Sequence, residues 1–378
     1  VRETLDRPRE IRRLFIARVR PWLAVLADAV REGQRAGLYH AELDAESYLV
    51  HMLQLIVVGI AAGGVFSPAT AKLVRALDYK PAIEKLTPMA LDSTLDPDTR
   101  ATALHTLAVA RAPRVKEAIA ATINADVPAL RVAALNAMAE INPTGADTIA
   151  AIDTALKRKV IEEQQPLLAL LGTMKGDGAE KLLGTWLGKL TKGEAPPEIA
   201  LDIYEAVKSL KSKNLNKKLA TVDASLKKQK YGIWSLALKG GDPAEGKAIF
   251  SGSTTAACMQ CHTMVTGLPS VGPDLSKVAS RLPPERLLQA VVDPPSEIAE
   301  GYGLISATLK NGSVVSGLLA KETKDEITLR LPATPITNTV KKADIATRTK
   351  PSSAMPVMTS LLTKMEVRHL VAYLQTLK

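Results

Sequence analysis

The only two cysteines of the chain, Cys258 and Cys261, lie in the short stretch CMQCH together with His262. Three residues apart on one helical turn, the two thiols would project from the same face, so both could reach the two vinyl groups of one porphyrin. The imidazole of His262 is a suitable ligand for the iron of that porphyrin. The spacing therefore predicts a covalent attachment site for one haem c.

Two other interpretations of the cysteine pair are a redox-active dithiol and one half of a zinc site. A dithiol of the thioredoxin kind needs a βαβ context, which the flanking sequence does not supply. A zinc ion would need two more ligands, and the other histidines are scattered singly along the chain: His40, His51, His105 and His369. The pattern thus favours haem over both alternatives.

Two residues downstream of the motif are candidates for holding the histidine and the haem. A ligating histidine needs a partner for its other ring nitrogen, and the carbonyl of Pro273 in VGPDL could accept the Nδ1 proton of His262. The alternative is that Pro273 is an ordinary turn proline. Arg281 could pair with a haem propionate, because a guanidinium binds a carboxylate well.

A methionine thioether is the expected second axial ligand of an electron-carrying haem. Met355 lies in the loop SSAMPVM, which Pro356 stiffens, and Met358 is the reserve candidate. His369 is a further conceivable ligand, although it falls in the middle of an expected helix. Three methionines are less suited, because they lie in the attachment turn or on a packing face: Met259, Met264 and Met365. With both axial positions filled, no catalytic residue is expected.

The elements around these residues combine helices with a small β-module. Asp242 before Pro243 predicts the start of a helix, and a second helix is expected over 284–292. Asn311-Gly312 between LISATLK and SVVSGLL is a strong hairpin signal, and EITLRL and TNTVK alternate in the same way. We therefore expect an antiparallel insertion of about four strands over 302–347.

Upstream, residues 72–236 repeat themselves. TRATALHTLAVA (99–110) aligns with LRVAALNAMAEI (130–141), and weaker copies come after them. The period is marked by leucines 31, 33 and 33 residues apart: Leu104, Leu135, Leu168 and Leu201. Such a period of helix pairs predicts an α-solenoid, and the segment resembles HEAT-like repeats, which serve as scaffolds or bind partners.

Charge is uneven along the chain. The net charge is +10, and residues 208–230 hold eight lysines against one acid, Asp223. This stretch predicts a basic surface that is either a solvated helix face or a docking site. Because the lysines elsewhere are dispersed and no aromatic residues are interleaved with them, a nucleic-acid partner is not expected. The 3% aromatic content, with abundant alanine and leucine, favours close-packed helices.

Residues 1–70 are helical in pattern and do not share the repeat of residues 72–236. The apolar stretch LVHMLQLIVVGIAAGGVF (49–66) is nearly long enough to span a membrane. His51, Gln54 and three glycines weaken that interpretation, so a buried or dimer-forming helix is expected and membrane contact is not favoured. Residues 10–66 resemble the ligand-binding half of tetracycline-repressor-type regulators, although the DNA-binding helix-turn-helix of those regulators does not precede them.

Residues 237–378 resemble the haem-binding c-type cytochrome domain of planctomycetes and verrucomicrobia. The motifs that carry this resemblance occur in the family's order: GGDPAEGKAIF, CMQCH, VGPDLS, LLQAVVDPPSEIAEGY, LKNGSVVSGLL, SSAMPVM and EVRHLVAYLQTL. The resemblance implies His262 and Met355 as axial ligands, Cys258 and Cys261 as thioether attachments, and Pro273 as the partner of the histidine. One departure is that Val357 follows Pro356, where the family continues with glycine and leucine.

The expected fold is mainly α: a helical N-terminal segment, a HEAT-like α-solenoid, and a class I-like cytochrome c domain with a small β insertion. The expected function is that of a monohaem electron-transfer protein that accepts electrons from a partner dehydrogenase. Because haem c is attached outside the bacterial cytoplasm, a periplasmic or otherwise exported location is expected, with the export signal upstream of Val1. The alternatives are a remnant of a ligand-sensing transcription regulator fused to a cytochrome, and a haem enzyme or sensor with an open iron.

Overall fold

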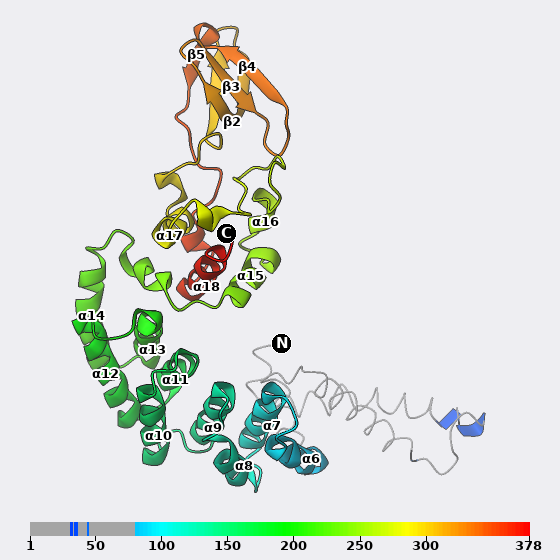
Figure 1. Ribbon diagram of the computed structural model, residues 1–378, viewed down its shortest axis with the longest axis vertical. Coiled ribbons are helices and arrows are strands. Elements are labelled where there is room, and N and C mark those ends of the chain that lie inside the picture. The colour runs from blue at the N-terminus through cyan, green and yellow to red at the C-terminus, as the bar shows by residue number, and fades with distance from the viewer. Residues whose placement is uncertain (1–30, 33, 37–43, 45–79) are drawn as a thin grey trace. The chain divides into compact units, whose positions relative to one another are not determined.

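The computed structural model describes residues 31–32, 34–36, 44 and 80–378. The described chain is mainly helical and contains one small antiparallel sheet, which confirms the expected fold class at this level (Figure 1). It divides into two compact units, with the boundary between Leu183 and Gly184. The predictions for residues 1–70, including the apolar stretch 49–66, lie almost entirely outside the described residues. In the described part, no helix has the length and hydropathy to cross a membrane.

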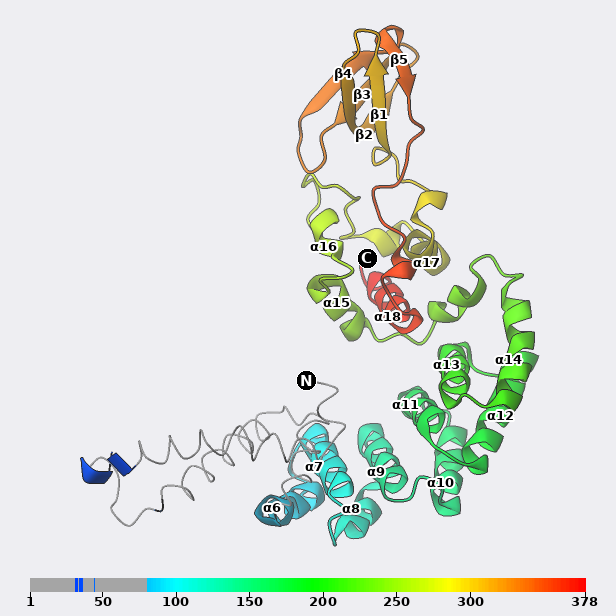
Figure 2. The ribbon, with the colours of Figure 1, turned by 180° about the vertical axis from the view of Figure 1, so that it is seen from behind.

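The first unit consists of short helices that pack against their neighbours in sequence. Its helices are α6 (Lys80–Leu91), α7 (Pro97–Val109), α8 (Val115–Thr122), α9 (Pro128–Ile141), α10 (Ala146–Lys157), α11 (Ile161–Thr173) and α12 (Asp177–Lys192), the last of which extends past the unit's end. Helix α7 packs against α6 and α9, and α9 packs against α11 (Figure 2). The repeat-marking leucines of this unit are buried at the centre of these contacts: Leu104, Leu135 and Leu168.

Polar residues in the first unit follow the same register as the leucines. Arg100, Arg131 and Gln164 each lie four residues before one of those leucines. Each side chain donates a hydrogen bond to a backbone carbonyl of the preceding segment, belonging respectively to Ala90, Ala125 and Leu156. The repeated donors thus attach each of these helices to the segment that precedes it, where the backbone carbonyls lack partners within a helix.

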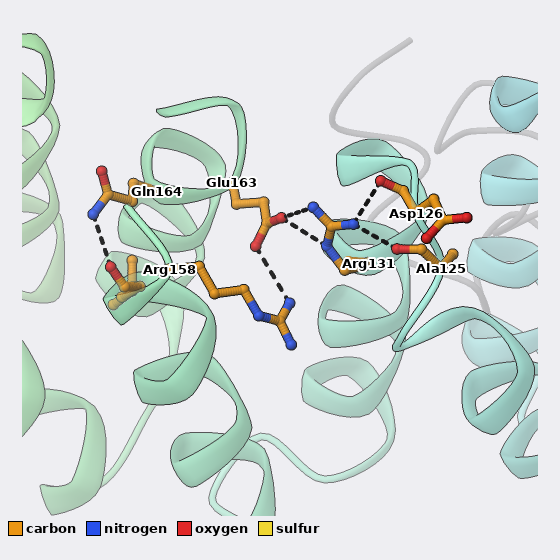
Figure 3. Close-up of polar contacts among 7 residues, drawn as sticks. Ala125, Asp126, Arg131, Arg158, Glu163 and Gln164 are labelled. Atoms are coloured by element: carbon orange, nitrogen blue, oxygen red, sulfur yellow. Dashed lines mark hydrogen bonds and ion pairs between the residues drawn. The ribbon is translucent and has the colours of Figure 1, made fainter. Parts of the chain in front are cut away.

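A buried carboxylate joins helices α9 and α11. Glu163 of α11 is fully buried, and its Oε1 accepts a hydrogen bond from Nε of Arg131 on α9 at 2.7 Å (Figure 3). Nη1 of Arg158 lies 3.5 Å from the other carboxylate oxygen. A buried carboxylate held by two guanidinium groups fixes the register of α11 against α9.

The second unit contains the predicted haem motif. Its helices are α13 (Ala200–Leu210), α14 (Lys213–Leu226), α15 (Pro243–Gly252), α16 (Cys258–Cys261), α17 (Pro284–Val292) and α18 (Lys364–Leu374). Short 3-10 segments connect them at Pro197–Ile199, Gly232–Leu238, Val278–Ser280, Pro294–Ser296, Lys342–Asp344 and Met358–Ser360. One core cluster draws buried residues from four helices, among them Leu201 of α13, Phe250 of α15, Leu288 of α17 and Val371 of α18.

Helices α15 and α18 pack side by side in this unit, as both ribbon views show (Figures 1 and 2). A Cβ added at Gly246 of α15 would lie 2.0 Å from the carbonyl oxygen of His369 on α18, so only glycine permits this approach. The rings of Phe250 and Tyr373 meet beside it, with their centroids 5.5 Å apart. This crossing holds together two segments that are far apart in the sequence.

The predicted helix starts are confirmed. Asp242 caps α15, where its carboxylate accepts a hydrogen bond from the N–H of Ala244 at 2.7 Å and Pro243 is the first helical residue. The helix expected over 284–292 has those bounds. At the start of α18, Thr363 and Glu366 form a reciprocal capping box, which the sequence analysis did not identify.

The second unit begins well before the domain boundary expected at residue 237. Asp202 of α13 and Arg368 of α18 form an ion pair at 2.6 Å, and both side chains are only 2% exposed. On the same two helices, Glu205 pairs with Lys364 at 3.0 Å. Because these contacts lie between α13 and α18, the helical hairpin α13–α14 belongs to the compact unit that contains CMQCH.

The sheet has one strand more than the four expected. Its strands are β1 (Leu304–Leu309), β2 (Val314–Glu322), β3 (Glu326–Arg330), β4 (Thr337–Lys341) and β5 (Ile345–Arg348), all antiparallel in the order β4-β3-β2-β1-β5. Gly312 has a φ of +88° in the predicted hairpin between β1 and β2. The additional strand, β5, is short and mostly exposed. Its sequence therefore lacks the alternation of apolar and polar residues that predicts a strand.

Candidate functional site

The two cysteines lie in α16, a helix of a single turn. Ala257 precedes it in the left-handed region, and the chain leaves the helix at His262, which has an extended conformation. Cys258 is half-buried against the core cluster, and burial raises the pKa of its thiol. Cys261 instead faces a cavity that its neighbour His262 also lines.

The imidazole of His262 has a defined tautomer. Its Nδ1 lies 2.8 Å from the carbonyl oxygen of Pro273, the partner that the sequence analysis named. Since a carbonyl can only accept a hydrogen bond, Nδ1 carries the proton and Nε2 keeps a lone pair. Burial also lowers the pKa of His262, which favours the neutral ring. The residue is therefore arranged as a neutral ligand with Nε2 available.

Gly272 is a functional candidate that the sequence analysis did not name. A Cβ at this position would lie 2.6 Å from Cε1 of His262 and 2.8 Å from Nδ1, closer than any side chain tolerates. Its N–H donates a hydrogen bond to the carbonyl of Cys261 at 2.7 Å. The loop that provides the Pro273 carbonyl can thus lie against the ring only with glycine here. The signal in the sequence was the glycine directly before Pro273.

A cavity of about 380 Å³ adjoins α16, a volume within the usual range for cofactor sites of about 300–1,000 Å³. The structure brings most of the predicted site residues to its wall: Cys261, His262, Pro273, Arg281 and Met355. Apolar side chains form much of the rest, among them Leu275, Val278, Leu282, Leu287 and Val291. Residues from five separate stretches of sequence therefore meet around one space.

The two methionine candidates occupy different surroundings. Met355 lines the cavity, and its backbone N–H donates a hydrogen bond to Oγ of Ser353 at 3.1 Å, which fixes the loop. Met358, the reserve candidate, is 2% exposed within the core cluster and does not line the cavity. Only Met355 therefore shares the space that His262 faces.

Arg281 lies at the cavity wall but already has a partner. Its Nη2 donates a hydrogen bond to the carbonyl of Asp274, in the loop that carries Pro273. A second guanidinium, that of Arg286 on α17, lines the same cavity and pairs with Glu297. Arg286 was not predicted from the sequence, although helical spacing puts it on one face of the predicted helix 284–292 with Gln289.

The β-module also reaches this site. Tyr302, just before β1, lines the cavity, and the guanidinium of Arg330 from β3 lies 5.3 Å from the centre of its ring. Nη1 of the same arginine donates a hydrogen bond to the carbonyl of Ser270 at 3.2 Å. The end of the sheet is thereby attached to the loop that leads to Gly272.

His369, the alternative ligand, has a different role in this arrangement. Its Nδ1 accepts a hydrogen bond from the backbone N–H of Asp242 at 2.9 Å, across the α15–α18 contact. The ring is half-buried and does not line the cavity. His369 thus joins two helices.

Among the described residues, no group of three or more His, Cys, Asp or Glu side chains is arranged to hold a metal ion. Comparisons with protein-family models and with curated proteins find no match to this chain. The cavity is lined by one imidazole, one thioether and the thiol of Cys261, and the thiol of Cys258 lies on the same single-turn helix, against the core cluster. This donor set is suited to an iron porphyrin, since nitrogen and sulfur supply the axial ligands of haem and thiols supply its covalent attachment.

Proposed function

We propose that this protein is a monohaem c-type cytochrome that transfers single electrons. One observation carries the proposal: the neutral imidazole of His262, held by the Pro273 carbonyl, directly follows the Cys-x-x-Cys helix and lines the same cavity as Met355. An apolar cavity with a nitrogen and a sulfur ligand suits an iron centre whose two axial positions are both filled by the protein.

Each residue has a distinct role in this proposal. Cys258 and Cys261 would form the two thioether links, while Nε2 of His262 and Sδ of Met355 would ligate the iron. The Pro273 carbonyl keeps the proton on Nδ1 of His262, and this hydrogen bond fixes the ring angle and increases the basicity of Nε2. When bound, haem supplies a one-electron couple. The apolar side chains of the cavity exclude water, which influences the potential of that couple.

The rest of the chain supports an accessory role. The repeated register of buried leucines and polar donors in α7, α9 and α11 favours a HEAT-like scaffold that holds partners near the electron-transfer domain. The electron donor would be a partner dehydrogenase. Haem c attachment requires an exported, periplasmic location in bacteria.

The direct test is covalent haem content. The chain, fused to an export signal, is produced in bacteria that have a cytochrome c maturation system, and the purified protein is analysed by mass spectrometry after acid-acetone extraction. We expect the mass of one haem to remain on the wild type and to be absent from a variant with both Cys258→Ala and Cys261→Ala. Wild-type protein without covalent haem would refute the proposal.

A further inference from the structure

A row of exposed lysines extends from the end of α13 to the segment after α14. This lysine stripe comprises Lys208, Lys211, Lys213, Lys217, Lys218, Lys227, Lys228 and Lys230, and all eight are exposed. The stretch contains a single acid, Asp223, whose carboxylate accepts a hydrogen bond from the hydroxyl of Tyr204 at 2.7 Å. The described residues provide no ion pair to any of the eight ammonium groups.

The buried face of α14 is separate from these charges. Four apolar residues at helical spacing are buried against the unit: Leu215, Leu219, Val222 and Leu226. Lys213 and Lys217 lie on the opposite face, with Ala220 and Ala224 beside them. The outer surface of this helix is therefore both exposed and basic.

The positions of these lysines are electrostatically unfavourable for the stability of α14. Lys213 lies in the first turn of α14, where the helix dipole favours acidic residues, and that turn contains no acid. Lys213 and Lys217 are four residues apart, so their like charges repel each other. An ordinary solvated face alternates charges of both signs, and here the alternation is missing. Lys208 and Lys230 lie over the rings of Tyr204 and Tyr231, but the lysines on the outer face of α14 gain nothing from their neighbours' charges, which favours a role in binding.

The stripe continues to the proposed haem site. Nζ of Lys230 and the hydroxyl of Tyr231 both lie within hydrogen-bond distance of Oε1 of Gln289, at 3.2 and 3.0 Å. Gln289 belongs to α17 and lines the cavity with His262 and Met355. The end of the stripe therefore contacts the helix that forms one wall of the site, so a partner bound along the stripe would lie one residue layer from that wall.

We propose that the lysine stripe is the docking surface for the acidic face of a protein that exchanges electrons with this site, an inference that rests on the proposed function. The outer face of α14 has no large apolar side chain for insertion into a membrane interface. The stretch 208–230 also lacks aromatic residues on which nucleic-acid bases would stack. Complementary charge instead steers protein encounters and accelerates them at low salt.

The test compares two haem-loaded triple variants with the wild type. In one, Lys213→Gln, Lys217→Gln and Lys218→Gln neutralise the stripe. In the control, Lys310→Gln, Lys321→Gln and Lys324→Gln remove three exposed lysines of the β-module. The probe is a reduced flavodoxin of strongly negative net charge, and its second-order rate of electron transfer is measured by stopped flow between about 10 and about 300 mM salt.

We expect the stripe variant to react about tenfold more slowly than the wild type at low salt and to show a flatter salt dependence. The control variant should stay within about twofold of the wild type, because its lysines lie outside the stripe. Equal losses in the two variants, or no loss in the stripe variant, would overturn the proposal. Binding to phosphatidylglycerol vesicles that depends on the stripe, with unchanged electron transfer, would also overturn it in favour of a membrane.

A second measurement separates this inference from the proposed function. Fluorescein-labelled oligoglutamate is titrated into the same three proteins, and its anisotropy reports binding without any need for haem. Weaker binding by the stripe variant alone supports an acid-binding surface, even if covalent haem is absent and the electron-transfer proposal has failed. Equal binding by all three proteins contradicts the docking surface.

Discussion

At the scale of single residues, the position of the His262 ring depends on the absence of a side chain at Gly272. The peptide carbonyl of Pro273 holds Nδ1 from one side, and the Cα of Gly272 lies where any side chain would meet the ring. Tautomer and ring angle are therefore set by backbone atoms, which move less than side chains. In the proposed cytochrome, a histidine held in this way would require little reorganisation when the oxidation state of the iron changed.

Gly272→Ala should disturb this arrangement. The new Cβ would lie 2.6 Å from Cε1 of His262, so either the ring or the loop must shift. We expect a loss of about 1–3 kcal/mol in the free energy of unfolding and a changed absorption spectrum of the haem-loaded protein. Urea denaturation and visible spectroscopy measure these effects.

Gly252→Ala is the matched control, because no atom lies within 4 Å of a Cβ added there at the end of α15. Alanine should be neutral or stabilising by up to about 1 kcal/mol at this position. If the two variants behave alike, contact with His262 does not explain the glycine at 272.

The two methionines allow a second test at this scale. Met355→Ala removes a cavity-lining thioether, and Met358→Ala removes a core side chain that is 2% exposed. We expect Met355→Ala to lose the low-spin methionine–iron absorption band and to bind carbon monoxide, with little change in stability. Met358→Ala should keep the band and lose about 2–5 kcal/mol of unfolding free energy.

Retention of the band in Met355→Ala together with its loss in Met358→Ala would exchange the two assignments. Wild-type protein that readily binds carbon monoxide would instead indicate an open iron, as in a haem enzyme or sensor. Visible spectra of the reduced proteins, recorded with and without carbon monoxide, distinguish these outcomes.

At the scale of elements, the contact between α15 and α18 positions the segment that leads into the candidate site. It brings the segment before CMQCH against the C-terminal helix, with Gly246 at the point of closest approach. His369 adds a hydrogen bond, which its Nδ1 accepts from the N–H of Asp242. That bond requires a lone pair on Nδ1, so a proton on this nitrogen would break it.

The crossing should therefore weaken in mild acid. Burial, followed by the neighbouring charge of Arg368, lowers the pKa of His369 in the folded protein. Below about pH 6.5 the unfolded chain then binds more protons at this residue than the folded chain, so stability falls as the pH decreases. Urea midpoints between about pH 5 and 8 should show a smaller decrease for His369→Gln than for the wild type. If the wild type and His369→Gln showed the same pH dependence of stability, His369 would be excluded as a cause of the loss of stability in acid.

Some helices and strands were predicted correctly from the sequence, and others were not. The start of α15 at Asp242-Pro243 and the hairpin at Asn311-Gly312 were predicted correctly, because cap and turn chemistry is local. Strand β5 was missed, since its residues are mostly exposed and its pairing with β1 is determined only when the chain folds back. Gly272 was missed for a similar reason, because its steric role arises only once the loop lies on the ring.

At the scale of the whole molecule, the compact unit that contains CMQCH begins at Gly184. Composition and repeat period indicated a boundary near residue 237, after the last repeat. The buried contact between Asp202 and Arg368 joins residues 166 positions apart, and no local pattern encodes such a pair. Helix α13, which the repeat pattern assigned to residues 72–236, therefore belongs to the compact unit that contains the candidate site.

This ion pair provides a test of that unity. Both side chains are 2% exposed, and burial raises the pKa of Asp202 despite its partner, so the carboxylate needs the guanidinium. Arg368→Met leaves a buried, unpaired acid and should reduce the free energy of unfolding by about 3–5 kcal/mol. Adding Asp202→Leu removes that acid and should restore much of the loss, because two apolar side chains can replace a buried pair at little cost. The double-mutant cycle is measured by urea denaturation of the full chain. If the two losses simply add, the residues are not coupled, and α13 does not stabilise the C-terminal unit through this pair.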